Sequence, residues 1–280
     1  MIKEGRSAII ISASSDMGAA MSRRWLACSW NVLGTYRTRS QVVDELETQG
    51  VKLLCCDLSD TDSICQVCSE LKKLCSKWDV LVLCPGTQDP IGLFMEDDFD
   101  EWENSIRVNL TSQLRIVHAL LPFRNIDQKL GPCVIFFAGG GTNDAPLNYS
   151  AYILSKIGLI KMTELLDAEV KDTRFVIVGP GWVKTKIHES TLRAGNKAGS
   201  NYQRTIERLA GNELTPMEKV IDCCDWIIES PRNIVSGRNF SVMFDMWGTP
   251  ELIKKLTEEP NMYKLRRYGN DFMVKRRAKR

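Results

Sequence analysis

Apolar residues along the chain recur in two alternating patterns. Short runs of apolar and β-branched residues, typical of buried strands, alternate with longer stretches whose apolar positions recur at helical spacing. The strand-like runs cover residues 7–12, 31–36, 51–56, 80–84, 133–137, 174–178 and 239–244. The helical stretches cover residues 18–29, 40–49, 62–77, 99–121, 151–171 and 216–229. This alternation predicts an α/β fold, a doubly wound parallel sheet with helices on both faces.

Two segments interrupt the alternation. Residues 186–215 are polar and contain Gly195, Gly199 and Gly211. We expect them to form a mobile lid over the carboxyl ends of the strands, where ligands of such sheets bind. Residues 250–280 form a C-terminal extension, with a helix predicted over 250–258 and a basic end over 275–280 that is typical of a solvated tail. Residues 1–249 are then predicted to form a single domain.

Composition narrows the class of protein. Of the 280 residues, 44% are hydrophobic and 26% charged, as in a packed globular domain, and a net charge of +2 gives no reason to expect a nucleic-acid partner. No signal peptide precedes the first strand and no apolar stretch is long enough to cross a bilayer, so we expect a cytoplasmic protein without a membrane partner. Several of the ten cysteines lie in apolar runs, which is typical of free thiols. Cys65 and Cys68 have no second close pair to complete a zinc site, so we expect no metal.

The turn after the first strand, Ser12-Ala-Ser-Ser-Asp-Met-Gly18, consists mainly of small residues. Small side chains let the backbone approach a pyrophosphate at the start of the next helix, as in the Rossmann fold, and serine hydroxyls can donate to it. An ordinary serine-rich helix cap has the same composition. The turn therefore indicates a cofactor site only together with other features.

The turn after the second strand, Gly34-Thr-Tyr-Arg-Thr-Arg39, contains two arginines and no acid. An NAD site has a carboxylate here for the ribose 2′-hydroxyl, whereas an NADP site has an arginine for the 2′-phosphate. We therefore expect NADP(H) rather than NAD(H), with Arg37 as the better phosphate ligand. The alternative is a pair of solvated loop arginines.

Tyr152 and Lys156 are four residues apart on a predicted helix and so share one face. Reduction of a carbonyl needs a group that gives a proton to an alkoxide and takes it back. Tyrosine, with an ordinary pKa near 10, can do so when a neighbouring ammonium and a positive nicotinamide ring stabilise its phenolate. A chance surface pair would show the same spacing.

Further motifs appear in a fixed order. They are the turn at 12–18, Asp57-Leu58, Pro85-Gly86, Val108-Asn109-Leu110, Tyr152-x-x-x-Lys156 and Pro180-Gly181-Trp-Val-Lys-Thr185. Over residues 6–247 this order resembles the short-chain dehydrogenase/reductase family in its single-domain form. The resemblance implies an NADP(H)-dependent enzyme that interconverts a small-molecule carbonyl and alcohol by hydride transfer. It also implies a homodimer or homotetramer formed through the helices predicted over 99–121 and 151–171.

The resemblance implies a role for each matching residue. Tyr152 would be the general acid and base, Lys156 would hold the nicotinamide ribose and lower the pKa of Tyr152, and Asn109 would hold a water in the proton relay. Asp57 would meet the adenine, and Thr185 the nicotinamide amide or the phosphates. The full set of expected cofactor contacts is Ser12, Ser14, Ser15, Asp16, Met17, Arg37, Asp57, Leu58, Gly86, Tyr152, Lys156 and Thr185.

Three features depart from the family pattern. Ser12 and Asp16 replace two glycines of the cofactor turn, and Asp16 is unfavourable beside a pyrophosphate unless its side chain turns away or caps the helix. Leu83-Cys-Pro-Gly86 replaces Asn-Asn-Ala-Gly. The serine that contacts the substrate oxygen, thirteen residues before the tyrosine, is Gly139 here. That contact must then come from Thr142, from the backbone N–H groups of residues 139–141, or from the substrate itself.

Alternatives remain at the level of function. The glycine-rich loop is similar to that of family members of bacterial polysaccharide and nucleotide-sugar pathways, which favours a sugar or nucleotide-sugar substrate. The missing serine also fits a non-catalytic NADP(H)-binding sensor or structural module. A nucleotide-sugar epimerase or dehydratase is disfavoured, because the chain lacks the larger C-terminal domain and glycine spacing of those relatives. Trp182, expected near the substrate, would either stack on a sugar or ring, or pack in the protein.

Overall fold

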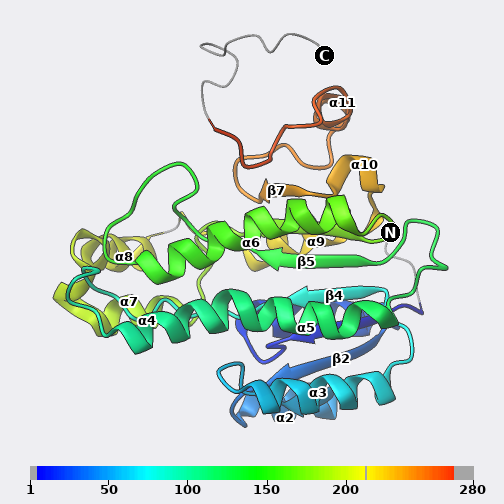
Figure 1. Cartoon of the computed structure of the whole chain (residues 1–280), viewed down its shortest axis with the longest axis horizontal. Coiled ribbons are helices and arrows are strands. Elements are labelled where there is room, and N and C mark those ends of the chain that lie inside the picture. The colour runs from blue at the N-terminus through cyan, green and yellow to red at the C-terminus, as the bar shows by residue number, and fades with distance from the viewer. Residues whose placement is uncertain (1–4, 212, 268–280) are drawn as a thin grey trace, which may run out of the picture.

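Seven parallel strands form the sheet of this computed structural model, which describes residues 5–211 and 213–267 (Figure 1). The strands are β1 Ser7–Ile11, β2 Asn31–Tyr36, β3 Lys52–Cys55, β4 Val80–Leu83, β5 Cys133–Phe137, β6 Arg174–Gly179 and β7 Arg238–Ser241. Their order is β3-β2-β1-β4-β5-β6-β7, so the direction of winding reverses between β1 and β4. The predicted doubly wound parallel sheet is confirmed.

Helices cover both faces of the sheet (Figure 1). One core is built with α1 (Asp16–Ala27), α2 (Gln41–Thr48), α9 (Met217–Glu229), α10 (Arg232–Val235) and α11 (Pro250–Glu258). The opposite core is built with α3 (Thr61–Leu74), α5 (Ser112–Leu120) and α6 (Ser150–Glu169), and α4 (Phe99–Ile106) packs on α6. In β5, Cys133, Ile135 and Phe137 enter the first core, and the residues between them enter the second. A strand covered on both faces needs such a continuous apolar run.

The last strand is shorter than the sequence predicts. A strand is expected to residue 244, but β7 ends at Ser241. The Asp245 carboxylate accepts from the backbone N–H of Ser241 at 2.7 Å, and the chain turns there. Phe244 is therefore exposed rather than in the sheet.

The stretch predicted as one helix over 99–121 is interrupted by a π-helical turn. This turn, Arg107–Thr111, lies between α4 and α5 and contains Asn109. A π turn carries an extra residue, loosens the regular backbone pairing and is frequent at functional sites. Apolar spacing alone does not distinguish it from an α-helix.

The predicted lid segment, 186–215, is largely helical. It contains α7 (His188–Ala194), a 3-10 turn (Gly195–Ala198) and α8 (Ser200–Ala210), which lie beyond the carboxyl ends of the strands at the left of Figure 1. Ser190 and Arg193 both donate to the Asp89 carboxylate, which holds α7 to the loop after β4. The mobility of the segment remains a prediction.

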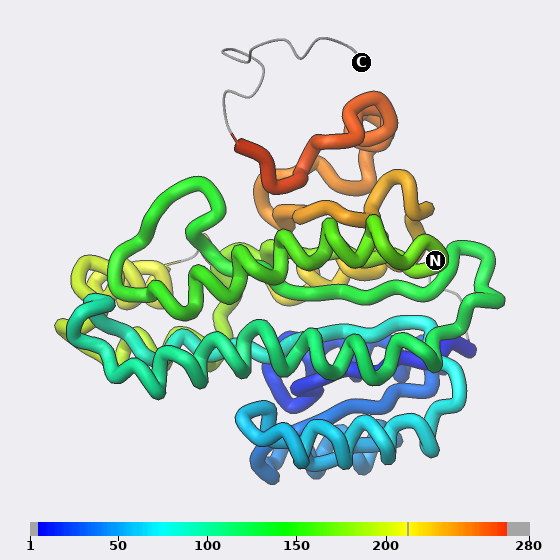
Figure 2. The backbone as a smooth tube through the Cα atoms, in the orientation of Figure 1, coloured from blue at the N-terminus to red at the C-terminus, as the bar shows by residue number. Residues whose placement is uncertain are grey.

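The C-terminal extension runs back from α11 over β7 toward α6 (Figure 2). The Tyr263 carbonyl accepts from the backbone N–H of Asn239 at 2.9 Å, and the Leu265 N–H donates to Glu164 at 2.6 Å. The extension thereby covers the outer edge of the sheet. The basic end predicted over 275–280 lies outside the described residues. Within the described ranges, no helix is long and apolar enough to span a membrane.

Candidate active site

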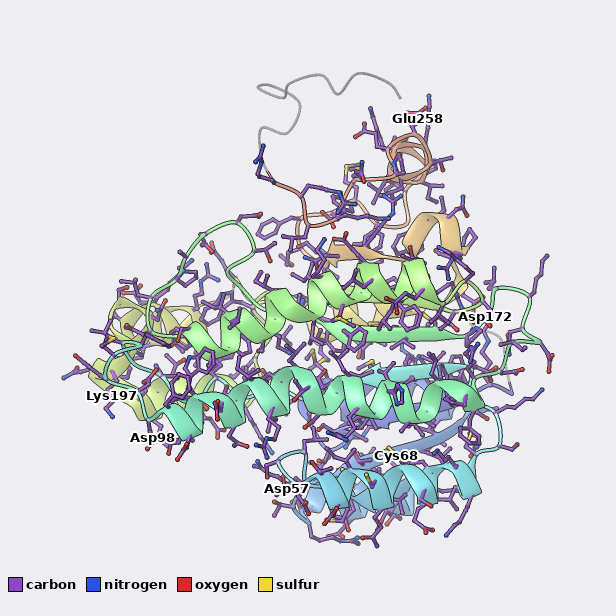
Figure 3. All side chains as sticks on the ribbon, viewed as in Figure 1. Asp57, Cys68, Asp98, Asp172, Lys197 and Glu258 are labelled. Atoms are coloured by element: carbon purple, nitrogen blue, oxygen red, sulfur yellow. The ribbon has the colours of Figure 1, made fainter. Side chains whose placement is uncertain are left out.

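A cavity of about 820 Å³ opens at the carboxyl ends of β4, β5 and β6. It is lined by α6, by the lid segment and by the loops after these strands, and it includes the predicted site residues Met17, Gly86, Thr142, Tyr152, Lys156 and Thr185. Asp57, at the end of β3, lies toward the same end of the sheet, whereas Asp172 lies at the opposite end (Figure 3).

The turn after β1 brings the backbone close to the start of α1. Ser12 has a φ of 60°, a left-handed conformation that suits the glycine of the family pattern. A Cβ on Gly18 would lie 2.4 Å from the Ser12 carbonyl oxygen, so only glycine fits there. The Ser15 hydroxyl caps α1 by accepting from the Gly18 N–H at 3.1 Å. The hydroxyls of Ser12 and Ser14 have no partner in the described parts of the chain and can serve a phosphate.

Asp16 is held by the lid segment rather than by its own helix. Its carboxylate accepts from the backbone N–H of Lys186 at 2.8 Å. This contact joins the cofactor turn to the base of the lid. The helix cap itself is Ser15, so of the two ways in which Asp16 could be accommodated, its side chain turns outward.

The two arginines after β2 differ in their surroundings. Arg39 pairs with Asp44 and Glu47 on α2 and lies over the Tyr36 ring. Arg37 is exposed and forms no ion pair within the described ranges. Of the two arginines, Arg37 is thus the one without a carboxylate partner, and its contact with a phosphate stays a prediction.

Asp57 and Leu58 occupy different environments. Hydrogen bonds from the backbone and hydroxyl of Ser59, and then the charge of Arg37, lower the pKa of Asp57. Asp57 is therefore an anion, and its carboxylate lies near enough to Arg37 to be stabilised by the charge of that arginine. The Leu58 side chain is buried in the core and its carbonyl accepts from Ser112 at 2.6 Å, so only its backbone N–H is left for a cofactor.

Tyr152 and Lys156 meet inside the cavity. Lys156 is buried, and its Nζ donates to the Phe137 carbonyl at 3.0 Å and the Pro85 carbonyl at 3.4 Å. The same Nζ lies 5.7 Å from the centre of the Tyr152 ring. Burial lowers the pKa of Lys156 to about 8 and raises the pKa of Tyr152 to about 12. The pair therefore presents a neutral phenol beside an ammonium near pH 7.

Tyr152 fills the space that a serine at position 139 would need. A Cβ on Gly139 would lie 2.7 Å from the Tyr152 hydroxyl oxygen and from its ring. Thr142 lines the cavity, and its hydroxyl makes no hydrogen bond to any described residue. The hydroxyl of Thr142 and the backbone of residues 139–141 thus both remain candidates for the contact with a substrate oxygen.

Asn109 is buried in the π turn, and both its side chain and its carbonyl have hydrogen-bond partners. Its side chain accepts from the Thr87 N–H at 2.9 Å and donates to the Thr87 carbonyl at 2.8 Å, which fixes the loop after β4. Its own carbonyl accepts from Gln113 Nε2 at 2.9 Å. Gln113 belongs to none of the sequence motifs, and the only sign of it in the sequence is an amide in an apolar stretch, four residues after Asn109.

Trp182 packs within the lid. One face stacks on the His188 ring with centroids 4.6 Å apart, and the Arg208 guanidinium lies 4.6 Å from its centroid. Trp182 also lines the cavity, so contact between its ring and a substrate stays a prediction beside this packing.

The residues present at this end of the sheet fit a dinucleotide. The close packing at Gly18, the free hydroxyls of Ser12 and Ser14 and the unpaired Arg37 together make a cradle for a pyrophosphate and a second phosphate. Among the described residues, no group of three or more His, Cys, Asp or Glu could hold a metal ion.

Comparison with known proteins agrees with this geometry. Residues 6–195, more than half of the chain, match the family model described as short chain dehydrogenase. The 3-oxoacyl-(acyl-carrier-protein) reductase FabG of Buchnera aphidicola (subsp. Schizaphis graminum) is 26% identical over 260 residues, which cover 88% of this chain and 99% of that protein.

Two solved structures share the fold. A short-chain dehydrogenase/reductase from Saccharomyces cerevisiae superposes with a TM-score of 0.75 at 19% identity, covering 89% of this chain and 98% of that chain. A variant of actinorhodin polyketide ketoreductase with NADPH superposes with a TM-score of 0.74 at 19% identity, covering 85% of this chain and 95% of that chain.

Proposed function

The chain belongs to the short-chain dehydrogenase family, and on that premise we propose that it is an NADP(H)-dependent oxidoreductase that interconverts a ketone and an alcohol. The observation that carries the proposal is the pairing of Tyr152 with Lys156 on one face of α6, inside the cavity. A sensor or structural module has no use for a phenol and an ammonium held together in this way.

Tyr152 is the proton donor in this proposal. NADPH, when bound, supplies the hydride. Tyr152 is protonated at neutral pH, because burial holds its pKa at about 12, and it gives its proton to the alkoxide oxygen as that oxygen forms. The Lys156 ammonium stabilises the phenolate that remains. Thr142 or the backbone N–H groups of residues 139–141 hold the substrate oxygen.

NADP(H) is preferred over NAD(H) because of Arg37. Its unpaired guanidinium suits a 2′-phosphate, which presents oxygens to a forked donor. Asp57 is a carboxylate on the next strand and is proposed to meet the adenine. The remaining proposed contacts are Ser12, Ser14, Ser15, Met17, Gly86, Thr185 and the backbone of Asp16 and Leu58.

The substrate is proposed to be a small-molecule ketone. FabG is named for a 3-oxoacyl group and the actinorhodin relative for a polyketide, and both names describe ketones. A keto sugar or nucleotide sugar, expected from the glycine-rich loop, carries the same reacting group and belongs in the same test. The lid is proposed to close over this substrate, and α4–α6 to form a homodimer or homotetramer.

The proposal is tested with Tyr152→Phe. NADPH and NADH are titrated by fluorescence, and ketones are then assayed with the wild type and the variant. We expect tighter binding of NADPH, turnover of a ketone by the wild type, and a loss of roughly 100-fold or more in kcat without loss of NADPH binding in Tyr152→Phe. NADPH binding with no Tyr152-dependent turnover would favour the sensor instead. A parallel Thr142→Val variant with unchanged kcat would remove the Thr142 hydroxyl from the mechanism.

A further inference from the structure

The polar groups around Lys156 include a side chain that the proposed mechanism does not use. Gln113 lies at the start of α5, four residues after Asn109, and is completely buried. Its Nε2 donates to the Asn109 carbonyl at 2.9 Å and to the Pro85 carbonyl at 3.3 Å. The Pro85 carbonyl also accepts from Lys156 Nζ at 3.4 Å. Gln113 and Lys156 are therefore joined through one shared carbonyl.

The oxygen of the Gln113 amide, Oε1, is buried and has no hydrogen-bond partner among the described residues. Exchanging the amide nitrogen and oxygen does not help, because both groups that face Nε2 are carbonyls and need a donor. Buried polar atoms in native proteins are nearly always paired, with protein or with ordered water. A donor is therefore required at Gln113 Oε1.

Asn109 differs from Gln113 in that each of its acceptors already has a donor. Its side chain is committed to Thr87, and its carbonyl already accepts from Gln113. The resemblance assigns to Asn109 a water beside the lysine. In this chain the buried acceptor that lacks a partner is Gln113 Oε1.

Lys156 has a donor to spare and no counter-charge. An ammonium carries three donors, and Nζ donates to the Phe137 and Pro85 carbonyls. The titratable groups that face it are Tyr152 on its own helix and Cys84 at the end of β4, and burial raises the pKa of each to about 12. Both are neutral near pH 7, and no described carboxylate pairs with Lys156. Neutral dipoles alone support this ammonium.

We propose that Gln113 is a positioning residue of the site: its Oε1 accepts from a buried water that in turn accepts from Lys156 Nζ, and this water keeps the lysine charged and in place. The inference rests on the function proposed above. It makes Gln113, rather than Asn109, the residue that holds water against the lysine.

Two substitutions test the inference. Gln113→Leu keeps a similar volume and removes the acceptor, whereas Gln113→Glu adds a negative charge. The titration of Lys156 is followed by NMR of isotope-labelled lysine, assigned with Lys156→Met. We expect the midpoint of Lys156 to fall by about one pH unit in Gln113→Leu and to rise in Gln113→Glu. The alkaline limb of the pH profile of kcat should move in the same directions. If the Leu variant does not fold, the upward shift in Gln113→Glu carries the test.

Ser112→Ala is the matched control. Ser112 is the neighbouring residue on α5, and its buried hydroxyl donates to the Leu58 carbonyl at 2.6 Å. We expect this variant to lose thermal stability without a shift in the Lys156 midpoint. A Gln113→Leu variant that loses stability in the same way and leaves the midpoint unmoved would overturn the inference. Because the titration needs no turnover, failure of the wild type to reduce any ketone would overturn the proposed function alone.

Discussion

Gly139 determines how closely Tyr152 approaches the loop after β5. A Cβ at this position would lie 2.7 Å from the tyrosine hydroxyl oxygen, well inside contact distance. We therefore expect Gly139→Ser, which restores the family serine, to displace Tyr152 and lower kcat by about 10-fold or more. Gly140→Ser is the control, because a Cβ there meets nothing within 4 Å. A rise in kcat in Gly139→Ser would contradict this expectation, because it would mean that the site has room for the family serine and lacks only its hydroxyl.

Lys156 destabilises the fold over a defined pH range. Its pKa falls from the ordinary 10.5 to about 8, so between these values the unfolded chain binds the extra proton. The resulting loss of folding stability is on the order of 3 kcal/mol. It is complete below about pH 8 and disappears as the pH rises toward 10.5. We expect any stability advantage of Lys156→Met over the wild type to shrink over this range in urea denaturation. A difference independent of pH would contradict the burial of a charged lysine.

At the scale of elements, the apolar pattern predicts most of the fold. It places every strand except β7 to within one residue at each end, because a strand buried on both faces must be apolar throughout. The apolar pattern fails where individual side chains determine the path of the backbone. The turn at Asp245 and the π turn around Asn109 leave no trace in apolar spacing.

The candidate site was predictable where chemistry has a fixed spacing. The meeting of Tyr152 and Lys156 in the cavity follows from helical geometry, whereas the role of Arg37 at its strand end stays a prediction. The outward turn of Asp16 toward Lys186 and the link from Gln113 to Pro85 could not be predicted, because each joins segments far apart in the sequence.

The loop after β2 gives a prediction on cofactor choice. Arg37 is free of ion pairs in the described chain, whereas Arg39 is held by Asp44 and Glu47. We expect Arg37→Ala to raise the KM for NADPH by about 10- to 100-fold, the effect of losing charge-assisted hydrogen bonds, and to leave the KM for NADH nearly unchanged. Arg39→Ala should alter neither by more than about 3-fold. Equal effects of Arg37→Ala on both cofactors would remove Arg37 from the phosphate site.

At the scale of the whole molecule, α4 and α6 present apolar side chains to solvent. Phe99, Leu154 and Leu165 are 54%, 53% and 43% exposed, on helices that pack together (Figure 1). Such a face is typical of an interface. We expect Leu154→Glu to reduce the mass measured by sedimentation, while Ile253→Glu on α11 leaves it unchanged. The same mass for the wild type and Leu154→Glu would exclude this face.

The central claim is that a Tyr152–Lys156 site without the family serine transfers hydride. The direct measurement is a single turnover with NADPH deuterated at the reactive carbon, followed by mass spectrometry of the alcohol. We predict deuterium on the alcohol carbon with the wild type. In Tyr152→Phe we predict that the rate falls by roughly 100-fold or more at equal NADPH binding. A wild-type protein that binds NADPH and transfers no deuterium to a 3-oxoacyl thioester, a polyketide or a keto sugar would contradict it.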